Sequence, residues 1–469
     1  MATVPMKSRQ QQLPPPLIPP HKWEGNRAAL AALCSVHLAH TSDKPMAQLS
    51  DDCFAFAGPL LPVDEVERII AQRVTPVAEI ETVPLAVAGG RVVARDVVAP
   101  IDLPPFDNAA VDGYAVRHAD LDTHAETRLK VVARITAGHA AARSLVAGEA
   151  ARIFTGAPMP AAADTVFMQE DVRVDADSVI VPPGLARGAN RRLAGEDVRR
   201  GAIVLPAGRR LAAQHVALAA ALGLTELAVR RRVRVALFST GDEIVEPGAP
   251  RPAPALFDAN RYLLAGLIER LGAAATDLGI LPDDPDRLAR AIAAAAQAHD
   301  LVLTSGGIST GEADHVRRAV EAVGTLVFWR VAIKPGRPVA MGVIAGTDPN
   351  AGTAFAGLPG NPAAVYVTFA RVVRPLLLRL AGAEAAPLMP LPVRAGFAYR
   401  KKAGRREYVR VKLTRGADGA VEAIKHAQEG AGIITSLTET DGLVELAEDA
   451  TAVVPGAPVG FLSYAALVG

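Results

Sequence analysis

Cysteine is scarce in this sequence: among 469 residues only Cys34 and Cys53 occur, both near the N-terminus. These two cannot build a disulfide framework or a thiolate metal site for the rest of the chain, so we expect a protein of the reducing cytoplasm. An excess of one charge is also missing, because 50 Lys and Arg stand against 49 Asp and Glu. This balance gives no sign of nucleic-acid binding, and any anionic ligand must be held by a local site.

Long apolar runs are missing as well. No uninterrupted run approaches the roughly 20 residues that a membrane-spanning helix needs, so we expect no membrane partner. The P-loop motif G-x-x-x-x-G-K-S/T is absent, which disfavours an ordinary P-loop ATPase. Half of the residues are hydrophobic, which fits a globular chain. Residues 1–58 are the exception, and we interpret them as a flexible N-terminal leader without a clean signal-peptide pattern.

The rhythm of the remaining chain predicts an α/β plus β protein of several domains. Residues 233–383 alternate strand-like and helical runs, which predicts a doubly wound, mainly parallel sheet covered on both faces. Residues 104–186 are rich in Gly, Pro and short Val/Ile runs and predict a small β domain. Residues 384–469 alternate β-prone runs with Gly and Asp turns, which predicts a C-terminal β-barrel. The segments 59–103 and 187–232 are expected to form one discontinuous, extended linker domain.

Two helices are indicated by local signals. Apolar residues at helical spacing predict a helix over Val63–Arg73. Asn361 followed by Pro362 is typical of a helix start, because Asn caps a helix and Pro suits its first position. We expect that second helix to run toward Leu380.

Three strand-to-helix turns of the α/β segment are rich in Gly and Ser. Such turns let backbone N–H groups approach an anion, and the dipole of the following helix favours negative charge. Each turn alone could be only a tight connection, but three at the carboxyl ends of strands in one sheet favour a phosphate-containing ligand. The residues of these turns that we expect to bind substrate are Thr240, Gly241, Asp242, Ser305, Gly306, Gly307, Ser309, Gly311, Pro359, Gly360 and Asn361.

Carboxylates gather at the same strand ends, and hard oxygen ligands beside a phosphate are what Mg²⁺ requires. Asp284 precedes Pro285 and is better explained as a helix N-cap. Asp283 is freer to face the ligand, and Glu243 has the longer reach of the acids after the first strand. With Asp314, these two residues are the candidate metal ligands.

Two cations lie in and just after the strand-like run 326–333. Arg330 and Lys334 are four residues apart, so on one continuous strand both would point to the same face and could hold an oxyanion. Taken alone, the pair is better explained as solvated strand residues. The turn at Pro335 and Gly336 fixes the place of Lys334 and makes it the stronger candidate, with both turn residues beside the substrate.

Eight motifs of this chain, in this order, resemble those of the bacterial molybdopterin molybdenumtransferases, whose eukaryotic relatives include the gephyrin E domain. The resemblance covers about residues 60–469. The Ser-Gly-Gly turn alone would be a weak sign, because the related pterin adenylyltransferases share it, whereas the first two motifs point specifically to the insertase. The motifs are residues 106–116, 153–160, 168–172, 188–198, 237–244, 304–314, 332–338 and 357–362.

The resemblance implies an elongated homodimer in which the linker domain takes part in dimerisation. Its active cleft would lie between the α/β domain of one subunit and the small β domain of the other. Arg330 stands where Lys is usual, which keeps the charge but changes its geometry. The small-domain motif has Ala109 where Ser is common. Family functional positions fall on Asp112, Thr155, Asp197, Glu243, Asp283, Asp314, Arg330 and Lys334.

The function implied is transfer of molybdate onto the dithiolene of adenylylated molybdopterin, with Mg²⁺ present and AMP released. A further expected partner is the molybdopterin adenylyltransferase. Two alternatives remain open on the sequence: the chain itself could adenylylate molybdopterin, or it could be a non-catalytic scaffold on the same fold. The additional domains disfavour the first alternative, and the complete set of carboxylates disfavours the second.

Overall fold

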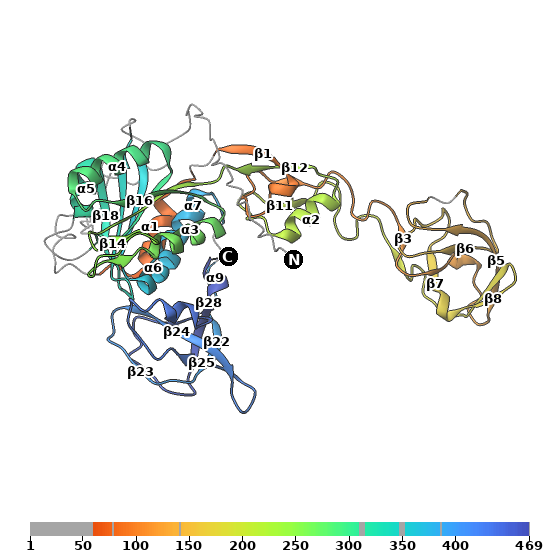
Figure 1. Cartoon of the computed structure of the whole chain (residues 1–469). Coiled ribbons are helices and arrows are strands. Elements are labelled where there is room, and N and C mark those ends of the chain that lie inside the picture. Colours follow the sequence, from red (N-terminus) through yellow and green to blue (C-terminus); the bar gives the residue numbers. More distant parts are fainter. Residues whose placement is uncertain are drawn as a thin grey trace, which may run out of the picture.

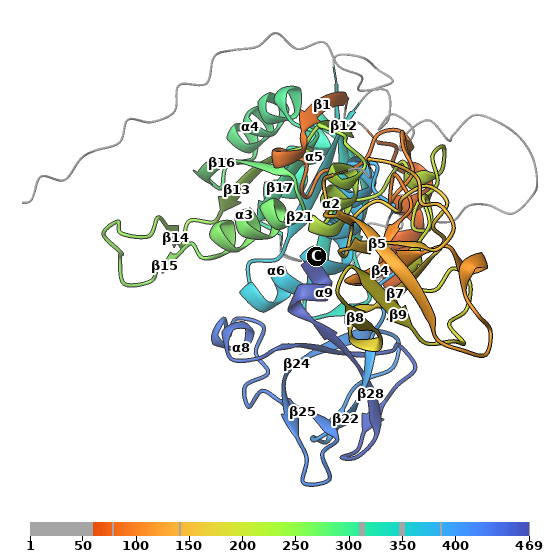
Figure 2. The same ribbon diagram turned by 90° about the vertical axis from the view of Figure 1, so that its right-hand side faces the viewer.

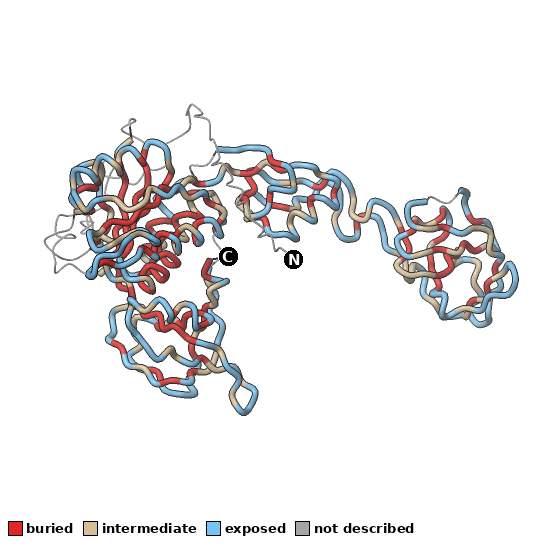
Figure 3. The backbone as a smooth tube through the Cα atoms, viewed as in Figure 1, coloured by how far each residue is buried: buried red, intermediate tan, exposed pale blue. Residues whose placement is uncertain are grey.

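The computed structural model describes residues 60–76, 79–139, 142–308, 315–346, 352–384 and 387–468. Four parts are visible in Figure 1: an α/β domain, a barrel beside it, a linker domain, and a small β domain at the far end of an elongated molecule. Each part has its own buried interior (Figure 3). Within these described ranges no helix is both long and apolar enough to cross a membrane.

A six-stranded sheet forms the centre of the α/β domain, with the strand order β16-β13-β17-β21-β20-β18. Only β20 runs antiparallel to its two neighbours, so the predicted mainly parallel sheet is confirmed. The central strands are buried along their whole length because helices cover both faces, which explains their continuous apolar sequences. The strands are β13 (Arg234–Thr240), β16 (Ala274–Leu281), β17 (Leu301–Ser305), β18 (Gly324–Arg330), β20 (Pro338–Ala345) and β21 (Gly352–Leu358).

Helices pack on both faces of this sheet. On one face, α4 and α5 contribute Leu288, Ile292 and Val316 to a shared core. On the other face lie α3, α6 and α7, and a single π-helical turn joins the last two into the expected helical run. The bounds are α3 (Asn260–Arg270), α4 (Pro285–Ala298), α5 (His315–Val323), α6 (Pro362–Thr368), η6 (Phe369–Val373) and α7 (Arg374–Leu380).

Helix α1 (Val63–Arg73) has the predicted bounds but a different place in the molecule. The prediction that residues 59–103 belong to the linker is wrong for α1, which buries Val63, Val66 and Ile70 in the core of the α/β domain. Its apolar stripe requires a large buried surface, which the sheet and its helices provide and the small linker does not. The linker domain therefore begins after α1.

Two chain segments far apart in sequence form this linker domain. Residues before the small β domain pair with residues after it, and Val83, Val93, Leu205, Leu227 and Val229 form a common core. Its elements are β1 (Ile80–Pro84), η3 (Leu85–Val87), β2 (Val97–Val98), β11 (Ile203–Leu205), α2 (Ala213–Ala221) and β12 (Glu226–Arg230).

The small β domain contains a second six-stranded sheet, ordered β7-β4-β6-β5-β9-β8. Gly113 on β4 is required by close packing, because a Cβ atom there would lie 1.8 Å from the carbonyl oxygen of Phe167. A short ribbon, β3 (Asn108–Ala109) with β10 (Arg191–Arg192), closes the domain. Its other elements are β4 (Gly113–Val116), η4 (His118–Asp120), β5 (Thr127–Ile135), β6 (Glu149–Ile153), β7 (Thr165–Met168), η5 (Gln169–Asp171), β8 (Arg173–Asp175) and β9 (Ser178–Val181).

The C-terminal domain is a closed barrel, as predicted. Strand β24 pairs with both β25 and β26, and the sheet returns through β22 and β28. Figure 2 shows the barrel below the α/β domain, from which the arm of β14 (Ile244–Val245) and β15 (Leu256–Phe257) projects. The barrel elements are β22 (Leu391–Ala395), β23 (Tyr399–Arg400), β24 (Arg406–Arg415), β25 (Val421–Lys425), α8 (Thr435–Thr438), β26 (Gly442–Leu446), β27 (Ala452–Val453), β28 (Pro458–Ser463) and α9 (Tyr464–Val468).

Candidate active site

Three neighbouring strands bring their glycine-containing turns together. In the sheet, Ser305 lies opposite Ser239 of β13 and opposite Leu358 of β21. Gly306 has a φ of +88°, and a Cβ atom there would lie 2.4 Å from the carbonyl oxygen of Thr240. Gly360 approaches it from the third turn, since a Cβ atom on Gly360 would lie 3.9 Å from the Cα atom of Gly306. The backbones after β13 and β17 therefore leave no room for a side chain at Gly306, and the third turn lies in ordinary van der Waals contact with it.

The next residue is restricted in the same way. Gly307 has a φ of +65°, and a Cβ atom there would meet Val316 at 2.5 Å and Thr240 at 2.6 Å. Position 307 therefore has no room for a side chain between Val316 and Thr240. Backbone N–H groups in such a turn can approach a phosphate closely, which is the arrangement the sequence suggested.

Asn260, the first residue of α3, connects these turns and was missed by the sequence analysis. Its side chain is 9% exposed, and Nδ2 donates to Ser305 Oγ at 2.9 Å and to the Gly360 carbonyl at 2.7 Å. Ser305 Oγ in turn donates to the Pro359 carbonyl at 3.2 Å. Asn260 Oδ1 is buried without a hydrogen-bond partner among the described residues. The sequence signal for this role of Asn260 was a polar residue at the start of a helix beside the strand ends.

Asp283 and Glu243 lie at the same end of the sheet. Asp283 Oδ1 is 3.5 Å from Thr240 Oγ1, and the carbonyl of Asp283 lies 2.6 Å from His315 Nδ1. The exposed Glu243 folds back over Gly241, where a Cβ atom would be 2.7 Å from Glu243 Oε2.

Their neighbours Asp284 and Asp242 differ from them. Asp284 is the N-cap of α4, accepting from the backbone of Arg287 at 2.8 Å, as predicted. Asp242 is exposed to solvent. Of these four acids, Asp283 and Glu243 are the ones whose carboxylates lie against the β13 turn.

Only some of the residues expected to bind Mg²⁺ and substrate belong to the described residues. Ser309, Gly311 and Asp314 lie outside them. Among the residues that are described, no group of three or more His, Cys, Asp or Glu side chains could hold a metal. Asp283 and Glu243 are hard oxygen donors at one sheet edge, a chemistry that suits Mg²⁺.

The expected single strand through residues 326–333 is wrong. Strand β18 ends at Arg330, and the chain leaves the sheet because the backbone of Ala332 donates to Leu61 at 2.8 Å. A separate strand, β19 (Ile333–Lys334), then pairs with β24 of the barrel. Arg330 and Lys334 therefore do not share a face of one strand. Burial, followed by the charge of Arg337, lowers the pKa of Arg330.

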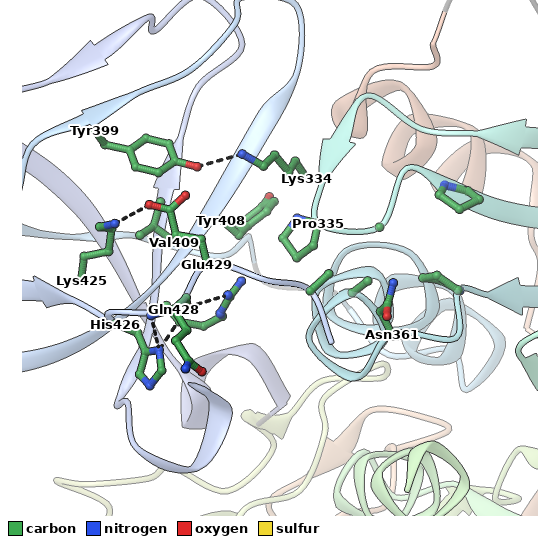
Figure 4. A pocket seen from close by; sticks show the side chains of 16 residues that line it. Lys334, Pro335, Asn361, Tyr399, Tyr408, Val409, Lys425, His426, Gln428 and Glu429 are labelled. Atoms are coloured by element: carbon green, nitrogen blue, oxygen red, sulfur yellow. Dashed lines mark hydrogen bonds and ion pairs between the residues drawn. The ribbon is translucent and has the colours of Figure 1, made fainter. Parts of the chain in front are cut away.

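Lys334 instead lines a cavity of about 220 Å³ between the α/β domain and the barrel (Figure 4). Its Nζ donates to Tyr399 Oη at 3.0 Å and to Glu407 Oε2 at 3.1 Å. The expected substrate residues Pro335, Gly336, Pro359 and Asn361 line the same space, with Pro338, Ala364, Tyr399, Tyr408, Val409, Arg410, Lys425, His426, Gln428, Glu429 and Ala431.

Arg410 is a second cation of this cavity that the sequence analysis missed. It is 5% exposed, and its guanidinium donates to the carbonyls of Gln428 at 3.3 Å and Gly430 at 3.2 Å. No carboxylate in the described ranges lies within salt-bridge distance of it, whereas Lys425 is paired with Glu429. Burial lowers the pKa of Arg410. A buried cation without a carboxylate beside a cavity is a candidate anion ligand.

The remaining predicted residues lie elsewhere in the chain. Asp112 Oδ1 accepts from the backbone of Thr155 at 2.8 Å and from its hydroxyl at 2.7 Å, and these bonds lower the pKa of Asp112. Both residues are in the small β domain, and Asp197 is exposed in a turn of the linker. Figure 1 shows the small β domain far from the α/β domain, so one chain does not bring these groups to the glycine turns.

The matches to known protein families follow the same division of the chain into domains. Three family models match: MoeA N-terminal region (domain I and II) over residues 61–223, probable molybdopterin binding domain over 236–379, and MoeA C-terminal region (domain IV) over 392–464. The converging glycine turns all belong to the second of these regions. The fold and the site thus define a multidomain protein built around a molybdopterin-binding-type α/β domain.

Curated relatives make the assignment more specific. A molybdopterin molybdenumtransferase of Haemophilus influenzae is 34% identical over 87% of this chain and 100% of its own length. One from a Nostoc species is 40% identical over 64% of this chain and 70% of its own. The crystal structure of a molybdopterin biosynthesis MoeA protein from Pyrococcus horikoshii superposes with a TM-score of 0.71 at 29% identity, covering 86% of this chain and all of that one. This chain belongs to the molybdopterin molybdenumtransferase family.

Proposed function

We propose that this chain is a molybdenum insertase, which transfers molybdate onto the dithiolene of adenylylated molybdopterin and releases AMP. The observation that carries the proposal is the junction of three glycine turns, two of them tied by Asn260 and the third in contact at Gly306, with Pro359 and Asn361 continuing into the cation-lined cavity. A phosphate cradle beside a space that attracts an oxyanion matches the two substrates of such a reaction.

Each part of the site has a distinct task in this proposal. The turn at Ser305, Gly306 and Gly307 holds the phosphates, with Gly307 as its backbone donor, because the N–H of Gly306 is bonded to the Leu358 carbonyl at 3.1 Å. Asp283 and Glu243 would hold Mg²⁺, which would supply positive charge beside the phosphoanhydride. Arg330 and Lys334 were expected to attract molybdate together, and the geometry favours Lys334 with Arg410 for this task. No covalent nucleophile is needed, because positioning and charge stabilisation suffice.

The small β domain enters the proposal through a second subunit. Asp112, Thr155 and Asp197 are too distant from the glycine turns of their own chain, so we propose a homodimer in which the partner supplies them. The Asp112–Thr155 hydrogen bonds keep that carboxylate ionised and fixed in direction. We also propose that the enzyme works in the cytoplasm and receives its substrate from a molybdopterin adenylyltransferase.

The test is AMP release from adenylylated molybdopterin with Mg²⁺, measured with and without molybdate. The variant Asp283→Asn should slow molybdate-dependent release about 100-fold, because it removes a charge from the site. Asp284→Asn is the matched control: the adjacent residue only caps α4, and Asn also caps helices, so the rate should stay close to that of the unchanged protein.

Two results would contradict the proposal. If AMP were released at the same rate without molybdate, hydrolysis of the substrate would not be coupled to metal insertion. Formation of adenylylated molybdopterin from ATP and molybdopterin by the purified chain would instead identify an adenylyltransferase.

A further inference from the structure

A buried carboxylate, Glu407, lies at the contact between the α/β domain and the barrel. Its side chain is 1% exposed and accepts hydrogen bonds from Tyr399 Oη at 2.8 Å, Lys334 Nζ at 3.1 Å and Arg405 Nε at 2.7 Å. An isolated buried carboxylate would be strongly disfavoured in its ionised form. Burial does raise the pKa of Glu407, but the bonds from Tyr399, Arg405 and Lys334 outweigh it and lower that pKa overall.

The backbone fixes this arrangement from both domains. In the parallel pairing of β19 with β24, Lys334 lies directly opposite Glu407. The side chain of Lys334 is 42% exposed, and its ammonium has three N–H donors, of which Tyr399 and Glu407 take two. Figure 4 shows Lys334 and Tyr399 meeting at the edge of the cavity. One donor of Lys334 is therefore available to a ligand there.

We propose that Glu407 is a positioning residue, whose buried carboxylate holds the ammonium of Lys334 in the direction of the molybdate-binding cavity. This inference rests on the proposed function of the cavity. Without Glu407 the four-carbon side chain of Lys334 would have one neutral partner, Tyr399, and would sample several rotamers. A loss of position of about 1 Å at a reacting centre can cost about 100-fold in rate.

If Glu407 positions Lys334, the variant Glu407→Gln should have a lower maximal rate of AMP release, whereas a role in charge neutralisation alone predicts an unchanged rate. The change removes a negative charge beside Lys334 and Arg405, so the cavity becomes more positive and attracts an oxyanion at least as well as before. If Glu407 positions Lys334, the maximal rate of AMP release should fall about tenfold or more, while the half-saturating molybdate concentration stays equal or decreases. A damaged cavity would lower the rate and raise that concentration together.

The experiment uses the purified full-length protein, with rates measured over a range of molybdate concentrations at saturating adenylylated molybdopterin. Asp64→Asn is the matched control, because Asp64 forms the other domain-bridging pair of β24, with the adjacent Arg406 at 2.8 Å. It should leave both kinetic parameters unchanged. In a Lys334→Met background, Glu407→Gln should cause no further loss of rate.

A second variant covers the case in which Glu407→Gln does not fold. Tyr399→Phe removes the hydroxyl that donates to Glu407 and accepts from Lys334, and it should give the same split with a smaller loss of rate. An unchanged maximal rate in folded Glu407→Gln, or a further loss in the Lys334→Met background, overturns the positioning role. Failure of the unchanged protein to release AMP in response to molybdate would reject the proposed function instead.

Discussion

The side-chain amide of Asn260 is bonded to the hydroxyl of Ser305 at 2.9 Å, which ties the start of α3 to the end of β17. The same amide reaches the turn after β21, so one side chain sets the spacing of two glycine turns. If those turns hold phosphate through their backbone, their separation determines the affinity for the pterin substrate.

Replacing Asn260 by Ala should therefore weaken substrate binding. We expect the half-saturating concentration of adenylylated molybdopterin to rise about tenfold, because the turns lose their common anchor. Thr353→Val is the control, since it removes a buried hydrogen bond to Ala296 at the opposite end of β21. The control should cost about 1 kcal/mol of unfolding free energy without changing substrate affinity. Equal effects of both variants on affinity would show that Asn260 acts only through stability.

Arg410→Met should lower molybdate affinity without much loss of stability. The buried guanidinium of Arg410 is bonded to two carbonyls and, within the described ranges, to no carboxylate, so an apolar chain of similar length should change the free energy of unfolding by only about 1 kcal/mol. Loss of a charged donor to the oxyanion should raise half-saturating molybdate about tenfold.

Arg371→Met gives the opposite pattern and serves as the comparison. Arg371 is equally buried but paired with Glu67 at 2.9 Å, so its loss leaves a carboxylate without its partner. We expect about 2 kcal/mol of destabilisation and unchanged molybdate affinity. The assignment of Arg410 is wrong if its variant binds molybdate as well as the Arg371 variant does.

The parts of the fold that follow local rules were predictable from sequence. Continuous apolar runs gave the buried strands of the parallel sheet, and an Asp followed by Pro marked the start of α4 correctly. Asn361 does stand before α6, although its side chain makes no capping bond in the described part of the chain. The backbone of Ala363 is instead bonded to the carbonyl of Ala431 in the barrel, at 3.0 Å.

The cavity between the domains was not predictable, because its residues come together only through tertiary contacts. Glu407 and Arg410 both belong to β24, more than 70 residues after Lys334, and nothing in their local sequence indicates that this strand pairs with β19. The same pairing explains why the strand expected over 326–333 is interrupted. The prediction that Arg330 and Lys334 share a face assumed a single strand in one sheet. The chain instead passes from one sheet to another within four residues.

A mixing experiment can test the shared active site of the proposed dimer. Asp112→Ala and Asp283→Ala chains should each be inactive alone. If partner subunits complete each site, equal mixing after subunit exchange gives one intact site in each mixed dimer and restores about a quarter of the unchanged activity. AMP release before and after exchange measures this. Complementation would be absent if each chain formed its own complete site.

Acid should destabilise the contact between barrel and α/β domain through Glu407. The bonds from Tyr399, Arg405 and Lys334 outweigh burial and lower the pKa of Glu407, so its stabilising contribution is complete above the ordinary Glu pKa of about 4.3. That contribution is lost as pH falls further, through the lowered pKa of the folded state.

The variant Glu407→Gln lacks this ionisation. Below about pH 4.3 its unfolding free energy should fall less steeply, by up to about 1.4 kcal/mol per pH unit relative to the unchanged protein. Denaturant unfolding at several pH values measures the two slopes. Parallel curves would mean that Glu407 has the same proton affinity in the folded and unfolded chains.

The position of α1 has a consequence for the order in which the protein can assemble during synthesis. Helix α1 packs against η6 and α7 and shares its core with β13, all of which are translated only after the linker and the small β domain. This helix must therefore wait, without its packing partners, while the linker and the small β domain are added and fold beside it. Removal of α1 should consequently harm the interior of a domain encoded near the middle of the chain.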